Sequence, residues 1–226
     1  MIVAIDGPAG AGKSTVARRV ADRLDFQYVD TGAIYRGVAR EALESGIPPE
    51  DGPAVAELAR GLAFDFREVD GGRLLHCDGR PLDEGVRTAR IGEASSKVSS
   101  NAEVREALLD IQRELGRRRS SVLEGRDIGT VVFPDAEVKV FLTAEPGERA
   151  RRRLAERADE EVDRDSEEFQ RVLEEIVERD RRDRQRDVAP LRPPDDAVEI
   201  DSTDLSIGEV VDRIVGLVED RCGEAN

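Results

Sequence analysis

Short apolar runs alternate with amphipathic stretches along most of this chain. The apolar runs, rich in β-branched residues as buried parallel strands are, cover 2–5, 26–30, 121–124, 138–142 and 197–200. The amphipathic stretches, with apolar residues three and four positions apart as in a helix with one buried face, cover 15–24, 33–45, 102–118 and 206–219. The alternation predicts an α/β fold with a five-stranded parallel sheet and helices on both of its faces.

The segment 47–92 departs from this alternation. After an expected helix over 54–62, short alternating pieces are separated by Asp70-Gly71-Gly72 and by Asp78-Gly79, which are hairpin signals. We therefore expect a small antiparallel sheet near 63–85, inserted into the α/β core.

Helices are also expected after this segment. One covers 91–100, and two more begin at Pro146 and after Ser166. The last helix of the chain is expected to bury an apolar face made of Ile207, Val210, Val211, Ile214, Val215 and Val218.

A glycine-rich loop joins the first apolar run to the first helix. Its members are Gly7, Pro8, Ala9, Gly10, Ala11, Gly12, Lys13 and Ser14, with Thr15 following. Glycines let backbone N–H groups turn inward around an anion, the helix start adds a positive dipole end, and Lys13 supplies a mobile cation. Strand, loop and helix in this order are the context that the phosphate-binding P-loop pattern requires. The loop therefore predicts binding of a nucleotide such as ATP, with Ser14 placed to ligate Mg²⁺.

Length and composition point to a cytoplasmic protein. No apolar run in the 226 residues approaches the length of a membrane span, and the first strand follows Met1 at once, leaving no room for a signal peptide. We expect no membrane contact. Cys77 and Cys222 match no metal-ligand spacing and are expected to be reduced, and the single histidine, His76, has no partner for a zinc site or a serine triad.

The formal net charge of −15 argues against nucleic acid as a partner, because surfaces that bind polyphosphate backbones are basic over a broad face. A nucleotide is itself an anion, so positive residues are expected to gather in one cleft while the remaining surface carries the acidic excess. Neither Asn101 nor Asn226 begins an Asn-Lys-x-Asp motif, which disfavours a regulatory GTPase.

Two further polar stretches, at 30–36 and 125–130, follow predicted strands. Ligands of open α/β sheets bind at the carboxyl ends of the strands. In the second stretch Arg126 and Asp127 lie between glycines, which favours ligand binding over surface solvation. The alternative is an internal salt bridge between Arg126 and Asp127 that holds the loop.

A third polar stretch, at 178–187, mixes arginine with acidic residues. At helical spacing Arg179, Asp183 and Arg186 share one face, whereas Arg181 and Arg184 point toward solvent or nearby carboxylates. On composition alone, a charge run of this kind is a solvated helix face.

The motifs at 6–15, 30–36, 125–134 and 180–191 together resemble those of the bacterial cytidylate kinases, and the resemblance runs from Ile2 to about Ile214. It implies the P-loop NTPase fold and transfer of the γ-phosphoryl group of ATP to CMP or dCMP, which gives ADP and CDP or dCDP. It also implies one P-loop kinase domain over 1–226, with an NMP-binding insertion at 32–120 and a short helical lid at 149–166. We expect a monomer.

Carried over by position, the resemblance assigns the CMP-contacting residues. The CMP phosphate and sugar are assigned to Thr31, Arg36, Arg126 and Arg186, the ribose to Arg179 and Asp183, and cytosine to Ser96, Arg105 and Asp127. The exocyclic amine of cytosine donates to a carboxylate, whereas uracil presents a carbonyl at that position. Asp127 is therefore expected to favour cytosine.

The resemblance assigns stabilisation of the transferred phosphoryl group to Lys13, Arg126, Arg186 and the lid residue Arg153. Arg149 and Arg152 also match the lid pattern. Two alternatives remain open. One is a kinase of the same fold with another acceptor, such as UMP, AMP or a small hydroxylated metabolite, and the other is a nucleotide-dependent sensor or assembly factor that catalyses nothing.

Overall fold

The computed structural model describes residues 1–69, 72–155 and 162–224. The chain forms two compact units, one made of Met1–Tyr28 with Arg119–Asn226 and the other of Val29–Arg118. Within the described ranges, no helix is both long and apolar enough to cross a membrane.

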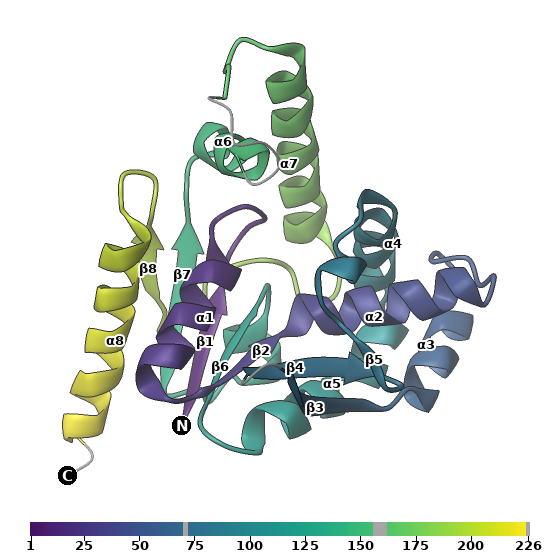
Figure 1. The fold of residues 1–226 in the computed structure, drawn as a ribbon, viewed down its shortest axis with the longest axis horizontal. Helices are drawn as coiled ribbons and strands as arrows, with labels where there is room; N and C mark the ends of the chain where they lie inside the picture. Colours follow the sequence, from purple (N-terminus) through teal and green to yellow (C-terminus); the bar gives the residue numbers. More distant parts are fainter. Residues whose placement is uncertain (70–71, 156–161, 225–226) are drawn as a thin grey trace. The chain divides into compact units, whose positions relative to one another are not determined.

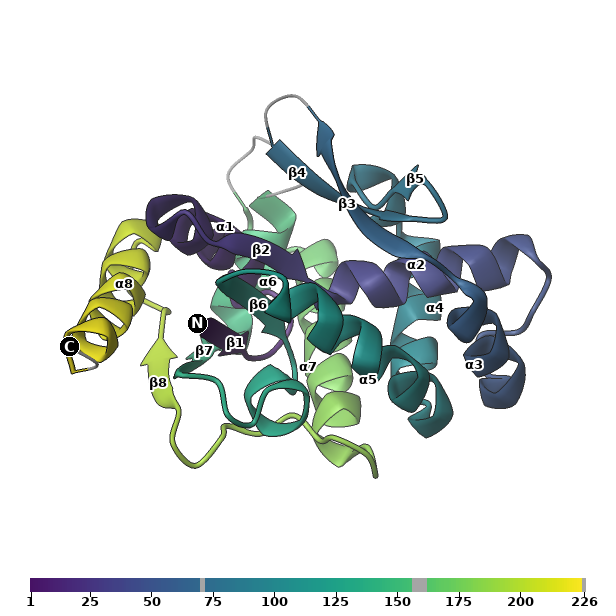
Figure 2. The ribbon, with the colours of Figure 1, turned by 90° about the horizontal axis from the view of Figure 1, so that it is seen from below.

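The first unit is built on a five-stranded sheet with the order β2-β6-β1-β7-β8 (Figure 1 and Figure 2). The strands are β1 (Ile2–Asp6), β2 (Gln27–Asp30), β6 (Ser121–Gly125), β7 (Val138–Thr143) and β8 (Val198–Asp201). The central strand β1 pairs in parallel with β6 and β7, in a register that sets Asp6 opposite Gly125 and Phe141. The predicted five-stranded parallel sheet of a P-loop fold is confirmed, and the carboxyl ends of its three central strands lie at one edge.

The described residues of this unit form the α-helices α1 (Lys13–Leu24), α6 (Pro146–Ala155), α7 (Glu167–Gln185) and α8 (Ile207–Glu224), with a short π-helical turn η2 (Ile128–Val132). Helices α1 and α8 pack against each other beside the sheet (Figure 1). Their core with the strands includes Val3, Val20 and Ile214, all completely buried. A separate apolar cluster joins α6 to α7 through Ala150, Leu154, Phe169, Val172 and Ile176.

The second unit contains the remaining helices and a small sheet. Its helices are α2 (Thr31–Glu44), α3 (Gly52–Gly61), α4 (Ala89–Ser100) and α5 (Ala102–Arg117), with a short turn η1 (Glu84–Val86). Its sheet has the order β3-β4-β5, made of β3 (Phe64–Val69), β4 (Gly72–Cys77) and β5 (Arg80–Pro81), paired antiparallel. The predicted antiparallel sheet near 63–85 is therefore confirmed, although residues 70–71 of the expected hairpin turn lie outside the described residues.

Several sequence-based expectations about helices were wrong: α1, α3 and α4 each begin two residues earlier than expected, α8 ends at Glu224 rather than 219, and three further differences concern α2, α7 and α8. Helix α2 begins at Thr31, before the expected 33, because the Asp30 carboxylate accepts a hydrogen bond from the Ala33 N–H and caps the helix. Helix α7 ends at Gln185, and Arg186 has an extended backbone, so Arg186 does not share the helix face of Arg179 and Asp183. Ile207 is 41% exposed at the first position of α8 rather than buried.

The expected lid at 149–166 is described only in part. Residues 149–155 form the end of α6, and 162–166 lead into α7, where the Ser166 hydroxyl caps the helix by accepting from the Phe169 N–H. Residues 156–161 lie outside the described residues.

Gly7, the first residue after β1, provides a test of this fold. Its φ is 151°, and a Cβ at this position would lie 1.9 Å from the carbonyl oxygen of Leu142 in β7. We expect Gly7→Ala to lower the free energy of unfolding by about 3 kcal/mol or more, as measured by urea denaturation.

The matched control is Gly216→Ala in α8, where an added Cβ meets no atom within 4 Å. An alanine there favours the helix and should raise the free energy of unfolding by about 0.5–1 kcal/mol. Equal stability of the two variants would contradict the close approach of Gly7 to β7.

Candidate active site

The glycine-rich loop connects β1 to α1 in the conformation that its glycines permit. Gly10 and Gly12 have φ values of 76° and 85°, in the left-handed region, and no side chain caps the start of α1 at Gly12. The Lys13 ammonium donates to the Pro8 carbonyl oxygen at 2.8 Å, so the loop closes on its own lysine. Ser14 is half-buried and Thr15 exposed in the first turn of α1. Because the start of α1 has no side-chain cap and the Lys13 ammonium lies within the loop, the loop is a candidate anion site.

Lys13 is buried among charged groups of the first unit. Burial lowers its pKa to about 7, and the nearby positive charges of Arg126 and Arg179 act in the same direction. Glu124 and Asp6 oppose them. An anion bound at the loop stabilises the protonated lysine.

Two buried carboxylates, which the sequence analysis did not select, lie at the ends of the strands that carry the site. Asp6 ends β1, and its two oxygens accept from the N–H groups of Ile128 and Gly129, each at 2.8 Å. Burial raises the pKa of Asp6 to about 6, although these two hydrogen bonds act against the shift. Glu124, near the end of β6, accepts from the Tyr28 hydroxyl. The sequence signal that could have identified both residues is a charged residue at the end of an otherwise apolar strand.

The stretch after β6 is fixed by Asp6 on one side and by α7 on the other. Asp127 precedes a single π-helical turn, Ile128–Val132, whose first two N–H groups bond Asp6. Arg126 donates from Nε to Asp183 of α7 at 3.0 Å. Arg126 is therefore held by a carboxylate of another element, which differs from the internal pair with Asp127 considered from the sequence.

Several of the predicted residues meet around this stretch. The guanidinium of Arg186 lies 3.7 Å from the Asp127 carboxylate, and its Nε donates to the Ala189 carbonyl oxygen. Burial opposes ionisation of Asp183, but the charges of Arg126 and Arg179 outweigh it and lower the pKa of Asp183. The first unit thus brings together the predicted residues Lys13, Arg126, Asp127, Arg179, Asp183 and Arg186.

The second unit contains its own cationic group at the start of α2. The Asp30 carboxylate, which caps this helix, also pairs with Arg36 at 2.7 Å and with Arg87 at 3.2 Å. Thr31 is buried as the first residue of α2, and Gly32 leaves room for the Arg36 guanidinium, which would lie 3.0 Å from a Cβ there. Arg87 was missed in the sequence because it belongs to no motif.

The predicted cytosine-reading residues of the second unit lie on neighbouring helices. Arg105 of α5 is buried, donates to the Ser99 carbonyl oxygen of α4 at 3.1 Å, and lies 5.6 Å from the centre of the Tyr35 ring. Ser96 is half-buried on α4, three residues before Ser99. Arg105 is therefore held by two helices and by a cation–π contact.

The arginines of α6 differ in their surroundings. Arg153 lies 3.6 Å from Glu175 of α7. Arg152 donates to the Ser202 hydroxyl at 3.0 Å, and its guanidinium would lie 3.9 Å from a Cβ at Gly12 of the P-loop. Arg149 is buried, and its Nη1 donates to the carbonyl oxygen of Ala9 in the P-loop.

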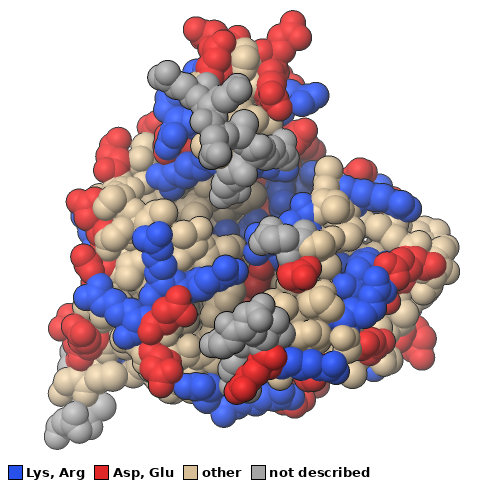
Figure 3. Space-filling view, viewed as in Figure 1, with Lys and Arg blue, Asp and Glu red and all other residues tan. Residues whose placement is uncertain are grey.

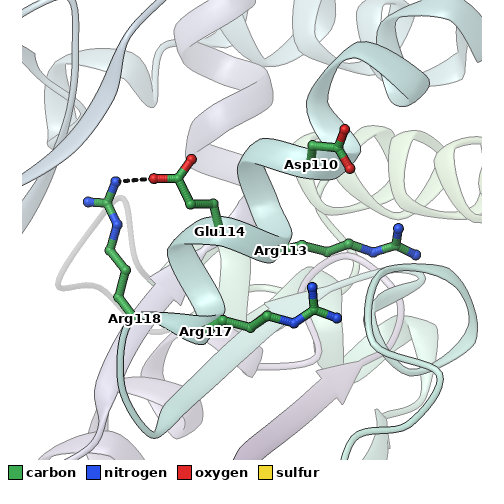
Figure 4. A pocket seen from close by; sticks show the side chains of 5 residues that line it. All are labelled: Asp110, Arg113, Glu114, Arg117 and Arg118. Carbon is green, nitrogen blue, oxygen red and sulfur yellow. Dashed lines mark hydrogen bonds and ion pairs between the residues drawn. The ribbon is translucent and has the colours of Figure 1, made fainter.

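No cluster of three or more potential metal-ligating side chains occurs in the part of the chain that the structure describes. A surface hollow is lined by residues from α5 and its end, Asp110, Arg113, Glu114, Arg117 and Arg118, where Arg118 pairs with Glu114 (Figure 4). It contains none of the predicted site residues. On the face seen in Figure 3, acidic and basic side chains are interspersed.

The P-loop between β1 and α1, on this parallel sheet and with Arg126 and Arg179 near Lys13, is the arrangement of a P-loop kinase. The sequence profile of the cytidylate kinase family matches residues 3–220. The chain therefore belongs to the cytidylate kinase family.

Two relatives that are cytidylate kinases agree with this assignment. The chain is 45% identical to the cytidylate kinase of Geobacter sp. strain M21, covering 100% of this chain and 96% of that protein. It is also 45% identical to the cytidylate kinase of Exiguobacterium sibiricum, covering 96% of each. A solved shikimate kinase from Bacteroides thetaiotaomicron is 18% identical with a TM-score of 0.48, covering 97% of this chain and 98% of that one.

Glu148, in the first turn of α6, gives a test of this arrangement by pH. Its carboxylate accepts hydrogen bonds from Arg151 and Arg152, and these, Arg151 first, lower its pKa to about 2. Because the pKa of Glu148 is lower in the folded than in the unfolded state, the ionised carboxylate stabilises the fold, and it does so fully above pH 4.5. This contribution is lost as the pH falls toward 2. We expect Glu148→Gln to lower the free energy of unfolding by about 1 kcal/mol at pH 7, with the difference from wild type shrinking by pH 3.

Urea denaturation at both pH values measures this effect. Glu168→Gln serves as the control, because Glu168 is 60% exposed and its ion pair with Arg171 is long, at 3.8 Å. A Glu148→Gln effect that stays constant with pH would contradict the assignment.

Proposed function

We propose that this protein transfers the γ-phosphoryl group of ATP to CMP or dCMP. An oxygen of the CMP phosphate attacks Pγ in line, the bond from Pγ to the β–γ bridging oxygen breaks, and ADP and CDP or dCDP leave. Membership of the cytidylate kinase family supports this function. The observation that carries it is the group of cations at the P-loop, in which the buried Lys13 lies near the half-buried Arg126 and Arg179, because phosphoryl transfer requires positioning and charge neutralisation above all.

The donor phosphates are assigned to the P-loop backbone and Lys13. The oxygen donors nearby suit Mg²⁺, since the Ser14 hydroxyl and the Glu124 carboxylate are ligand types that this cation prefers. Magnesium, when bound, neutralises charge on the phosphate oxygens. Arg152 and Arg153 of α6 are proposed as the lid arginines. Arg152 lies near Gly12 of the P-loop and donates to the Ser202 hydroxyl.

For the phosphate of the acceptor, CMP or dCMP, we propose the residues that the family resemblance assigns to it: Thr31 and Arg36 in the second unit, and Arg126 and Arg186 in the first. Arg87, which shares Asp30 with Arg36, is added to Thr31 and Arg36. All four arginines are oriented by carboxylates, so their guanidinium groups are set before an anion arrives.

The nucleoside of the acceptor uses the remaining residues. The ribose is proposed to meet Arg179 and Asp183, and cytosine to meet Ser96, Arg105 and Asp127. The burial of Asp127 and Arg105 supports base reading, because a hydrogen bond in a dry site discriminates strongly.

Removal of the site cations tests the mechanism. We expect Lys13→Ala and Arg126→Ala each to reduce kcat by about a thousandfold, because each removes charge stabilisation from the transferred group. The measurement is ADP release in a coupled assay with ATP and CMP. Arg184→Ala, at an exposed position of α7, is the control with wild-type turnover. Near-normal rates in both site variants would refute the assignment.

Acceptor choice tests Asp127 separately. An amide can donate to the uracil carbonyl that a carboxylate repels, so Asp127→Asn should lower the ratio of kcat/KM for CMP over UMP by about tenfold or more. The wild-type ratio is measured in the same acceptor panel with CMP, dCMP, UMP and AMP. A wild-type preference for UMP or AMP would overturn the proposed acceptor, and ATP binding without acceptor-stimulated ADP formation would favour the sensor alternative.

We expect the protein to act in the cytoplasm as a monomer, with small nucleotides as its partners and without nucleic acid. The formal net charge of −15 supports the last point, because nucleic acid carries the same sign.

A further inference from the structure

Arg149 of α6 is enclosed by hydrogen-bond acceptors from three parts of the first unit. Its Nε donates to the Ala144 carbonyl oxygen at 2.9 Å, and its Nη1 donates to the Ala9 carbonyl oxygen at 2.9 Å. Its Nη2 lies 2.6 Å from the Asp180 carboxylate of α7. All three nitrogens of the guanidinium are used, and the residue is 2% exposed. The match of Arg149 to the lid pattern suggested an arginine that contacts a ligand. Its guanidinium is instead bonded within the protein.

The contact of Arg149 with Ala9 and Gly10 positions the P-loop. A Cβ at Gly10 would lie 3.1 Å from the Arg149 Cβ, so the tip of the loop rests on this side chain. In a trans peptide the C=O and the following N–H point in opposite directions. Because Arg149 holds the Ala9 carbonyl oxygen, the N–H of Gly10 must point away from Arg149, which is the orientation an anion inside the loop requires.

The contact of Arg149 with Asp180 positions α7. Asp180 is 5% exposed and lies between Arg179 and Asp183 in sequence. Asp183 in turn holds Arg126 at 3.0 Å. A continuous set of contacts thus runs from the Ala9 carbonyl through Arg149 and Asp180 to the helix that orients Arg126.

Stability alone does not account for a buried ion pair at this place. The Oδ1 atom of Asp180 is buried and accepts no hydrogen bond from the described residues, and such an atom is costly. An apolar pair would extend the cluster that already joins α6 to α7 without this cost. The ion pair instead fixes the orientation of the Arg149 guanidinium and of the Asp180 carboxylate.

We propose that Arg149 and Asp180 are positioning residues for phosphoryl transfer. They hold the peptide between Ala9 and Gly10 in its anion-binding orientation and set α7 against it, and neither side chain touches a substrate. The donor site and the α7 part of the acceptor site are thereby coupled. The acceptor half of this inference rests on the proposed function, whereas the P-loop half requires only that ATP binds.

The test uses Arg149→Lys, Asp180→Asn and the double variant in the full-length protein. Asp180→Asn keeps the shape of the side chain, so it remains informative if Arg149→Lys folds poorly. All assays are made well below the melting temperature of each variant, determined by circular dichroism. We expect Arg149→Lys to raise the Kd for a fluorescent N-methylanthraniloyl-ATP about tenfold, and Asp180→Asn to lower kcat/KM for CMP about tenfold.

Coupling predicts that the double variant is little worse than the more damaged single variant, because both changes break one bridge. Arg151→Lys is the matched control on α6, since Arg151 pairs with Glu148 and is 42% exposed, and it should leave both constants within twofold of wild type.

Two results would overturn the proposal. In the first, the folded variants keep the Kd for the ATP analogue and kcat/KM for CMP within twofold of wild type and lose only melting temperature, which is the outcome of a purely structural role. In the second, the effects of the two changes multiply in the double variant. Failure of the proposed function is distinguishable, because it appears as a wild-type preference for another acceptor and leaves the ATP-analogue measurement unaffected.

Discussion

The site depends on one electrostatic constraint, which is that the buried Lys13 is held close to two half-buried arginines. Lys13 is buried, and Arg126 and Arg179 lie near enough to lower its pKa further. The carboxylates of Asp6, Glu124 and Asp183 lie close to these cations and offset their mutual repulsion. The remaining repulsion is relieved by an anion, so part of the free energy that binds a polyphosphate is already present in the folded protein.

The same carboxylates give the site its geometry. Asp6 of β1 bonds the turn that follows Asp127, Asp183 of α7 holds Arg126, and Asp180 of α7 holds Arg149. In each case the acid and the group it holds come from different elements. The strand ends, the P-loop and α7 are therefore locked to one another before any substrate binds, which is the preorganisation that charge stabilisation requires.

The second unit repeats this principle on a smaller scale. Asp30 caps α2 and at the same time orients Arg36 and Arg87, so one carboxylate sets a helix start and two cations. A formal net charge of −15 is thus compatible with anionic substrates. Part of the acidic excess lies inside the molecule, where it directs arginines rather than repelling ligands.

The P-loop, the five-stranded sheet and the small antiparallel sheet could be predicted from the sequence, because glycine positions, apolar periods and turn residues act over a few neighbouring residues. Arg126 and Asp183 could also be selected, because they lie in recognisable motifs. Long-range contacts were needed to show that Asp6 and Glu124 are buried near Lys13, that Arg87 joins Arg36 at Asp30, and that Arg149 bonds the P-loop. The tertiary structure also placed Arg186 beyond the end of α7 and left Ile207 exposed. The physical reason is that an arginine or a carboxylate has no periodic signature: its role is set by partners far away in the sequence, such as Ala9 and Asp180 for Arg149, and these meet only in the folded chain.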